Sequence, residues 1–117
     1  MSQNKKIIEK YMDGFNKSDH EQILSCLTDD IEWILPGAFH LKGKEAFDKE
    51  IANPAFVGRA VIKTHRVVEE NDVVVAEGSV QTQKKTGEIL HLVFCDVFLM
   101  KNGKIKQLTS YLMEVKK

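Results

Sequence analysis

Residues 90–115 read LHLVFCDVFLMKNGKIKQLTSYLMEV, two apolar runs joined by Asn102-Gly103, a dipeptide typical of tight β-hairpin turns. Successive side chains of a strand point to opposite faces of a sheet. One face of the first run therefore carries Asp96 among large apolar neighbours, namely Leu92, Phe94, Phe98 and Met100. A carboxylate in such surroundings needs a hydrogen-bond partner, a raised pKa or a functional role. The stretch predicts a buried hairpin with a candidate functional acid in its middle.

The composition indicates a single globular domain over residues 1–117, with 43% hydrophobic and 29% charged residues. Seventeen basic residues balance seventeen acidic ones, which argues against a nucleic-acid-binding protein. No apolar run approaches the ~20 residues that span a membrane, and the N-terminal residues lack the apolar core of a signal peptide. We therefore expect a cytoplasmic protein that binds neither nucleic acid nor membrane.

The two cysteines, Cys26 and Cys95, lie in apolar runs far apart in the sequence, and we expect both to be reduced and buried. No residue spacing matches a zinc site, a P-loop or a dinucleotide-binding fingerprint. The sequence therefore predicts no metal and no cofactor.

Hydrophobic periodicity predicts helices followed by strands. Helices are expected over residues 5–16, from about 19 to before Asp29, and over 44–52. The pattern S-x-x-E at residues 18–21 has the form of a capping box and marks the second helix start. Strands are expected over 31–35, 60–69, 73–83, 90–100 and after Gly103, with loops at 38–43 and 55–59. Helices first and antiparallel strands after them indicate an α+β domain.

Four strings in this order resemble the nuclear transport factor 2-like superfamily, which includes SnoaL-like polyketide cyclases and ketosteroid isomerases. They are YMDGFNKSD (11–19), TDDIEWILPG (28–37), LKGKEAF (41–47) and CDVFLMKNGKI (95–105). The resemblance implies a cone-shaped barrel in which three N-terminal helices pack on a curved, mostly antiparallel sheet. It also implies a deep apolar pocket, and a homodimer formed through the outer face of the sheet.

The ketosteroid isomerases supply a pattern for the candidate catalytic residues. There, a tyrosine and a neutral aspartic acid donate hydrogen bonds to a developing oxyanion, and a second aspartate moves the proton. By this resemblance, Tyr11 matches the tyrosine and Asp96 the neutral acid, while Leu35 stands at the base position. Because leucine cannot abstract a proton, the two-carboxylate route is disfavoured. The SnoaL-like cyclases, in which a buried aspartate is helped by a histidine, resemble this chain more closely.

The implied ligand is a small apolar organic molecule that carries a hydrogen-bond acceptor such as a carbonyl group. Asp96 and Tyr11 are the candidate catalytic residues. The candidate ligand-binding residues are Phe15, Trp33, Leu35, Phe47, His65, Phe94, Phe98, Ser110 and Leu112. Four of these residues have a structural alternative: Asp96 as a structural acid, Tyr11 and Trp33 as core rings, and His65 as a sheet residue away from the pocket.

The register of the closing hairpin has two alternatives. A two-residue type I′ turn at Asn102-Gly103 sets Asp96 opposite Thr109 and puts Tyr111 on the pocket side. A three-residue loop with a glycine bulge sets Asp96 opposite Leu108 and lets Ser110 and Leu112 line the pocket. The resemblance favours the second.

Three functions fit these residues. The first is cofactor-free isomerisation, cyclisation or aldol-type chemistry, with Asp96 as acid and base and Tyr11 as donor. The second is a ligand-binding or sensing module without turnover, and the third is a protein-interaction domain. Epoxide hydrolysis, which uses an Asp-Arg-Asp set on this fold, is disfavoured because nothing pairs Arg59 or Arg66 with two acids.

Overall fold

The computed structural model describes residues 2–51 and 56–115, leaving aside the side chains of residues 56–60. Within these residues the chain forms three helices and six strands. In chain order they are α1 (Gln3–Lys17), α2 (His20–Ser25), β1 (Leu27–Leu35), β2 (Phe39–Lys42), α3 (Lys44–Ile51), β3 (Phe56–Glu70), β4 (Val73–Lys84), β5 (Ile89–Lys101) and β6 (Lys104–Glu114).

Side-chain caps define where the first two helices begin. The Ser2 hydroxyl accepts a hydrogen bond from the Lys5 amide at 3.1 Å, and the Asp19 carboxylate accepts one from the Gln22 amide at 3.0 Å. Helix α2 therefore begins where the sequence predicts, but its cap is Asp19. Ser18 instead ends α1 in a left-handed conformation, with φ of 55°.

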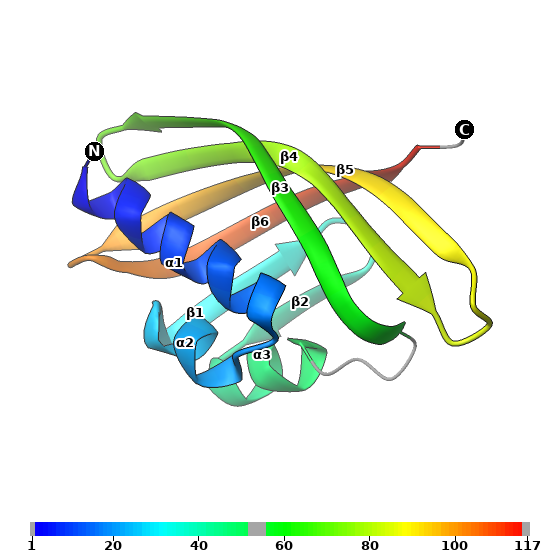
Figure 1. Cartoon of the computed structure of the whole chain (residues 1–117). Coiled ribbons are helices and arrows are strands. Elements are labelled where there is room, and N and C mark those ends of the chain that lie inside the picture. The colour runs from blue at the N-terminus through cyan, green and yellow to red at the C-terminus, as the bar shows by residue number, and fades with distance from the viewer. Residues whose placement is uncertain (1, 52–55, 116–117) are drawn as a thin grey trace.

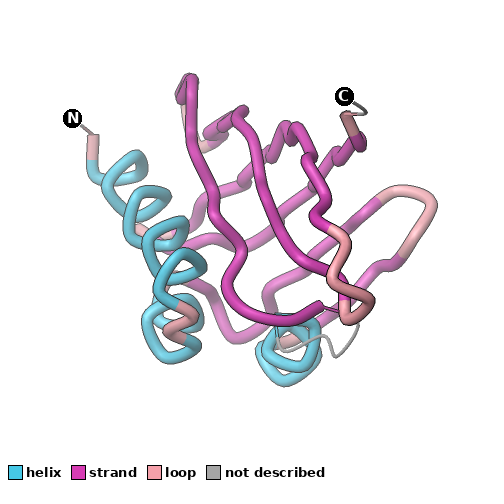
Figure 2. The backbone as a smooth tube through the Cα atoms, turned by 45° about the vertical axis from the view of Figure 1, so that its right-hand side comes forward, coloured by secondary structure: helices cyan, strands magenta, loops and turns pink. Residues whose placement is uncertain are grey.

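The strands form one sheet in the order β2-β1-β6-β5-β4-β3. Only the β1–β6 pair is parallel among the described pairs, and the others are antiparallel. The sheet curves around α1, while α2 and α3 lie by β1, as Figure 1 shows. Figure 2 shows the curvature from a second side. The predicted α+β fold is confirmed, and its cone-shaped sheet stays open between the edge strands β2 and β3.

Three strand boundaries differ from the sequence predictions. Residues 39–42, predicted as a loop, form β2, which pairs with β1 from Glu32↔Lys42 to Leu35↔Phe39. Strand β1 begins at Leu27, four residues before the predicted start. Strand β3 begins at Phe56, so most of the predicted 55–59 connector is strand, paired with the end of β4. Residue 55 lies outside the described residues.

The β5–β6 hairpin combines a two-residue turn with a bulge. Asn102 and Gly103 both have positive φ, 52° and 76°, as a type I′ turn requires. Met100 then pairs with Ile105, but Leu99 pairs with Gln107, which leaves Lys106 as the extra residue. Asp96 consequently faces Ser110. Both predicted partners, Thr109 and Leu108, were wrong.

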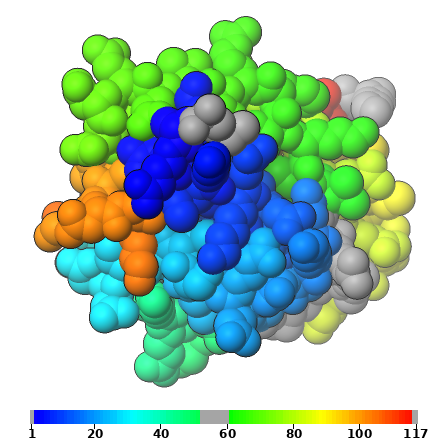
Figure 3. Space-filling model, turned by 60° about the vertical axis from the view of Figure 1, so that its left-hand side comes forward, coloured from blue at the N-terminus to red at the C-terminus, as the bar shows by residue number. Residues whose placement is uncertain are grey.

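The core fills the space between α1 and the concave face of the sheet. Its buried members include Ile8, Tyr11, Ile23, Phe98 and Leu108. Figure 3 shows α1 (blue) between β3 (green) and the β5–β6 turn (orange). None of the helices in the described residues is long and apolar enough to cross a membrane.

Candidate functional site

A small apolar cavity opens between α1 and the concave face of the sheet, with a volume of about 160 Å³. Five strands and α1 contribute to its wall. The lining residues are Tyr11, Met12, Phe15, Trp33, Ile62, Val80, Leu92, Phe94, Asp96, Ser110 and Leu112. Its polar side-chain groups are the Asp96 carboxyl, the Ser110 hydroxyl, the Tyr11 phenol and the Trp33 indole N–H, so the cavity offers hydrogen bonds at a few points in an apolar wall.

Asp96 is the ionisable centre of this cavity. It projects from β5 between Ala76 of β4 and Ser110 of β6. Burial disfavours the charged form and raises the pKa of Asp96 from 3.8 to about 7, against the opposing effect of a hydrogen bond from Ser110. The carboxyl therefore exists in both protonation states at neutral pH, as a group that both takes and returns protons must.

Ser110 connects Asp96 to the tryptophan of β1. Its hydroxyl is buried and hydrogen-bonds to the Asp96 carboxyl. The Trp33 indole donates from Nε1 to Ser110 Oγ at 3.1 Å. A chain of hydrogen bonds thus links three strands, β1, β6 and β5.

Tyr11 approaches the cavity from α1 and is 2% exposed. Its ring packs edge-on against Phe15 and Phe98, with centroid distances of 5.1 and 5.5 Å. Burial, then the nearby charges of Asp96 and Cys26, raise the pKa of the Tyr11 phenol well above 10. The phenol therefore keeps its proton at neutral pH and can donate a hydrogen bond.

The cavity brings together both candidate catalytic residues and most of the candidate ligand-binding residues. Tyr11 and Asp96 line it, and Phe15, Trp33, Phe94, Ser110 and Leu112 do as well. Ser110 and Leu112 face the cavity because the Lys106 bulge sets the hairpin register. The second register alternative therefore predicted the pocket side of β6 correctly, although it placed the wrong residue opposite Asp96.

The other candidates lie elsewhere. Phe47 and Phe98 are core residues behind the cavity wall, Phe47 stacked on Trp33 at 4.4 Å. Leu35 is half-buried at the end of β1, opposite Phe39. His65 is the bulged residue of β3 and lies in a groove on the outer face of the sheet, with Nε2 3.3 Å from Ser79 Oγ.

Four cavity residues were missed by the sequence analysis, although their periodicity could have identified them. Met12 belongs to the apolar stripe of α1, and Leu92 shares a strand face with Asp96. Ile62 and Val80 pair with each other across β3 and β4. The segments of β3 and β4 that carry Ile62 and Val80 contain no distinctive polar residue facing the cavity, so no motif marked them as part of its wall.

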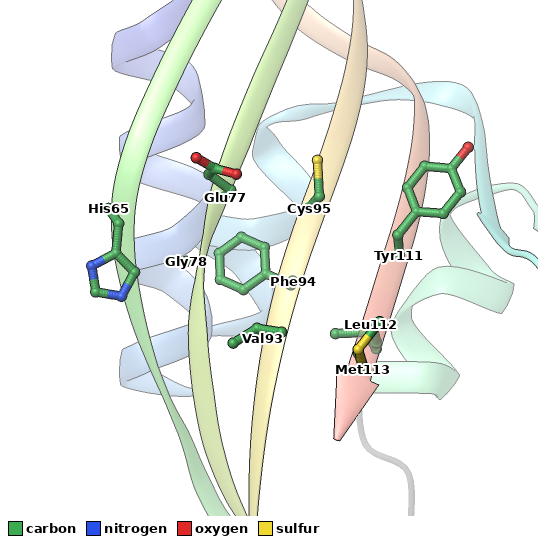
Figure 4. Close-up of a pocket in the computed structure, with 9 residues that line it drawn as sticks. All are labelled: His65, Glu77, Gly78, Val93, Phe94, Cys95, Tyr111, Leu112 and Met113. Atoms are coloured by element: carbon green, nitrogen blue, oxygen red, sulfur yellow. The ribbon is translucent and has the colours of Figure 1, made fainter. Parts of the chain in front are cut away.

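The outer face of the sheet carries a second hollow of about 440 Å³. Figure 4 shows its residues with α1 behind the sheet: His65 on β3, Glu77 on β4, Cys95 on β5 and Tyr111 on β6. Tyr111 and Met113 are 53% and 69% exposed, so this face presents large apolar groups to its surroundings.

Among the described residues, no three histidine, cysteine or acidic side chains lie together in a way that could hold a metal ion. His40 is bonded to Glu32 at 2.9 Å, and His20 to Asp48 at 2.5 Å.

Comparisons with known proteins place this geometry in context. The model of the SnoaL-like domain family matches residues 8–108. No curated protein sequence is similar to the chain. An NTF2-like protein of unknown function from Burkholderia pseudomallei K96243 superposes with a TM-score of 0.90 and 18% identity, covering 97% of this chain and 92% of that one.

Two further solved structures are similar. TerC, co-crystallised with polyporic acid, has a TM-score of 0.85 and 23% identity, covering 93% of this chain and 90% of its own. A candidate polyketide cyclase from Xanthomonas campestris pv. campestris has a TM-score of 0.85 and 21% identity, covering 93% of this chain and 89% of its own. At these identities the likeness shows the fold.

Proposed function

The chain belongs to the SnoaL-like domain family, and on this premise we propose that it binds a small carbonyl compound beside Asp96 and moves a proton on it. The observation that carries the proposal is a buried carboxyl in an apolar cavity, with a pKa of about 7. Such a group is both acid and base near neutral pH. The co-crystallisation of TerC with polyporic acid supports an organic ligand on this fold.

In the proposed reaction, the Asp96 carboxylate removes a proton from the carbon next to the carbonyl group, and the C–H electron pair forms an enolate. The Tyr11 phenol donates a hydrogen bond to the enolate oxygen. The Asp96 carboxylic acid then returns the proton to another carbon, which yields the isomer and restores the carboxylate. In a cyclisation, the enolate carbon attacks a second carbonyl and Asp96 protonates the new alkoxide.

One acid must serve both steps. By resemblance to the ketosteroid isomerases, Leu35 stands where a second carboxylate would act, and Leu35 cannot carry a proton. A pKa near 7 supports the double role, because neither protonation state of Asp96 is costly to reach at neutral pH.

The cavity volume supports a small ligand. About 160 Å³ is close to the ~150 Å³ of an apolar protein cavity that holds benzene. No lysine or arginine is among the described residues that line the cavity, which supports a neutral molecule. We therefore propose a ligand of about one six-membered ring with one carbonyl group.

The test uses cyclohex-3-enone, whose conversion to the conjugated cyclohex-2-enone requires one transferred proton and can be followed by ultraviolet absorbance. We expect turnover by the wild type, and loss of turnover with retained binding in Asp96→Asn. Binding is followed by the fluorescence of Trp33, the single tryptophan. Binding without turnover in the wild type would favour the sensing module, and the absence of binding would contradict both pocket functions.

We also propose that the outer face of the sheet forms a homodimer. Val93, Tyr111 and Met113 are large, exposed and neighbouring on β5 and β6. A strand with apolar side chains on both faces, as β5 has, needs cover on both. A two-fold axis over this face would let each copy cover the same patch on the other.

A further inference from the structure

The Trp33 indole is held in one orientation by rings from three other elements. It stacks on Phe47 of α3 with centroids 4.4 Å apart and planes at 27°. Phe39 of β2 and Phe15 of α1 meet it edge-on at 5.3 and 6.5 Å. Because these contacts fix the plane of the indole, they also fix the direction in which its N–H points.

That N–H points to Ser110 and not directly to the acid. Trp33 Nε1 is 3.1 Å from Ser110 Oγ, and the two residues are 77 positions apart in sequence. A serine hydroxyl has one hydrogen to donate and two lone pairs that accept. With one lone pair taken by the indole, the hydroxyl hydrogen is free to point at the Asp96 carboxyl on the opposite strand.

We propose that Trp33 is a positioning residue that acts through the Ser110 hydroxyl to orient and stabilise the Asp96 carboxylate. Its effect on turnover rests on the proposed function, but the coupling itself does not. Without the indole donor, the Ser110 hydroxyl can rotate and bond elsewhere. Without Ser110, the carboxylate loses its donor on β6.

Among the described residues, few other ionisable groups surround Asp96, so the titration of Asp96 can be separated from theirs. On the cavity side these are Tyr11 of α1 and, next to it, Cys26 at the end of α2. On the outer face, burial, then the nearby charges of Glu77 of β4 and of Asp96, raise the pKa of the Cys95 thiol of β5. Ala76, the β4 residue opposite Asp96, carries no charge.

The first experiment measures the titration of the Asp96 carboxyl by carbon-13 NMR. The bond from Ser110 lowers the pKa of Asp96, so Ser110→Ala should raise the midpoint, by about 1 pH unit for a hydrogen bond to a charged group. Trp33→Phe should raise it by a smaller amount. In the Ser110→Ala variant, the further change Trp33→Phe should not raise the Asp96 midpoint any more, because the indole acts on Asp96 through the Ser110 hydroxyl, which is then absent.

A control separates the loss of the Ser110 hydroxyl from the loss of any hydroxyl on the sheet. Ser79→Ala removes a hydroxyl on the outer face and should leave the midpoint unchanged. An unchanged midpoint in Trp33→Phe, or additive effects of Trp33→Phe and Ser110→Ala, would overturn the proposal.

The second experiment needs no change at Trp33 or Ser110 and so does not depend on their variants folding. Trp33 is the single tryptophan, so tryptophan fluorescence reports on the surroundings of this one indole. We expect a fluorescence transition at the same pH as the Asp96 titration, and its loss in Asp96→Asn. A transition that persists in Asp96→Asn, or none in the wild type, would contradict the coupling. Neither measurement requires turnover, so a failed cyclohex-3-enone assay leaves this test intact.

Discussion

Asp96 on β5 lies directly opposite Ser110 on β6. The extra residue Lys106 forms a bulge that shifts this pairing by one residue from that of a regular hairpin. A bulge of this kind shifts every following side chain to the other face of the strand. It lets Ile105 and Leu108, three residues apart, both point into the core, and it brings the Ser110 hydroxyl to the acid. The bulge at Lys106 therefore places the polar groups of Asp96 and Ser110 side by side in the cavity.

The burial of Asp96 predicts a pH-dependent stability. Because folding raises the pKa of this acid from 3.8 to about 7, the folded state binds more protons than the unfolded state between these values. The stability contributed by the protonated acid is fully present below about pH 4 and is lost as the pH rises to 7. Each pKa unit is worth about 1.4 kcal/mol, so the loss is about 4 kcal/mol.

Urea unfolding at pH 4 to 8 checks this prediction. The difference in unfolding free energy between the wild type and Asp96→Asn should fall as the pH rises and level off above pH 7. The asparagine variant supplies the control for all other titrating groups. A difference that stays constant or rises with pH would show that Asp96 is not buried as described.

Tyr11→Phe tests the phenol while keeping the ring. The contacts to Phe15 and Phe98 are made by the ring and should survive, so the stability cost should be about 1 kcal/mol. Turnover of cyclohex-3-enone should fall by about 10²–10³ in kcat, as for loss of an oxyanion donor. Tyr111→Phe, on the outer face and 53% exposed, is the matched control and should change neither. Equal effects of the two variants on kcat would count against a role for Tyr11.

Gly78→Ala tests the close approach of β3 and β4 behind the cavity. A Cβ at Gly78 would lie 2.0 Å from the Lys63 carbonyl oxygen and 3.0 Å from Phe94 Cε1. Since backbone must move to accommodate it, we expect a cost of about 1–3 kcal/mol, measured by urea unfolding. Ser79→Ala at the next position should cost less than about 0.5 kcal/mol. Similar values for the two would mean that the strands separate easily.

Met113→Lys tests the proposed dimer. Met113 is 69% exposed, so a lysine there should not disturb the folded chain, but it would put a charge in an apolar interface. Light scattering should give a dimer for the wild type and a monomer for the variant. Ala38→Lys, in the exposed β1–β2 turn, adds the same charge away from the face and should remain a dimer. A wild-type protein that is monomeric in solution would contradict the proposed dimer.

Much of the fold could be predicted because it follows from residue periodicity. The two faces of β5 were correct: Phe94 and Phe98 point inward with Asp96, and Val93 and Leu99 are exposed. The acid in an apolar run was enough to locate the centre of the cavity. Strand β2, in contrast, has only four residues after a turn, and its pairing with β1 carries no local signal.

The contacts that complete the site could not be predicted in the same way. The Trp33–Ser110 hydrogen bond joins residues brought together by the parallel β1–β6 pairing, which the residue pattern does not reveal. The bulge did leave a trace, because Ile105 and Leu108 are spaced for opposite faces of a regular strand. His65 lies at a bulge of β3, where strand alternation no longer predicts the face.

The role proposed for Asp96 is tested by the carbon-13 NMR titration of its carboxyl group in the wild-type protein. A buried acid poised to take and return a proton should titrate with a midpoint of about 7. A midpoint near 3.8, the ordinary value for a solvated aspartate, would contradict a role in proton transfer, because Asp96 would then be a permanent carboxylate unable to return a proton at neutral pH.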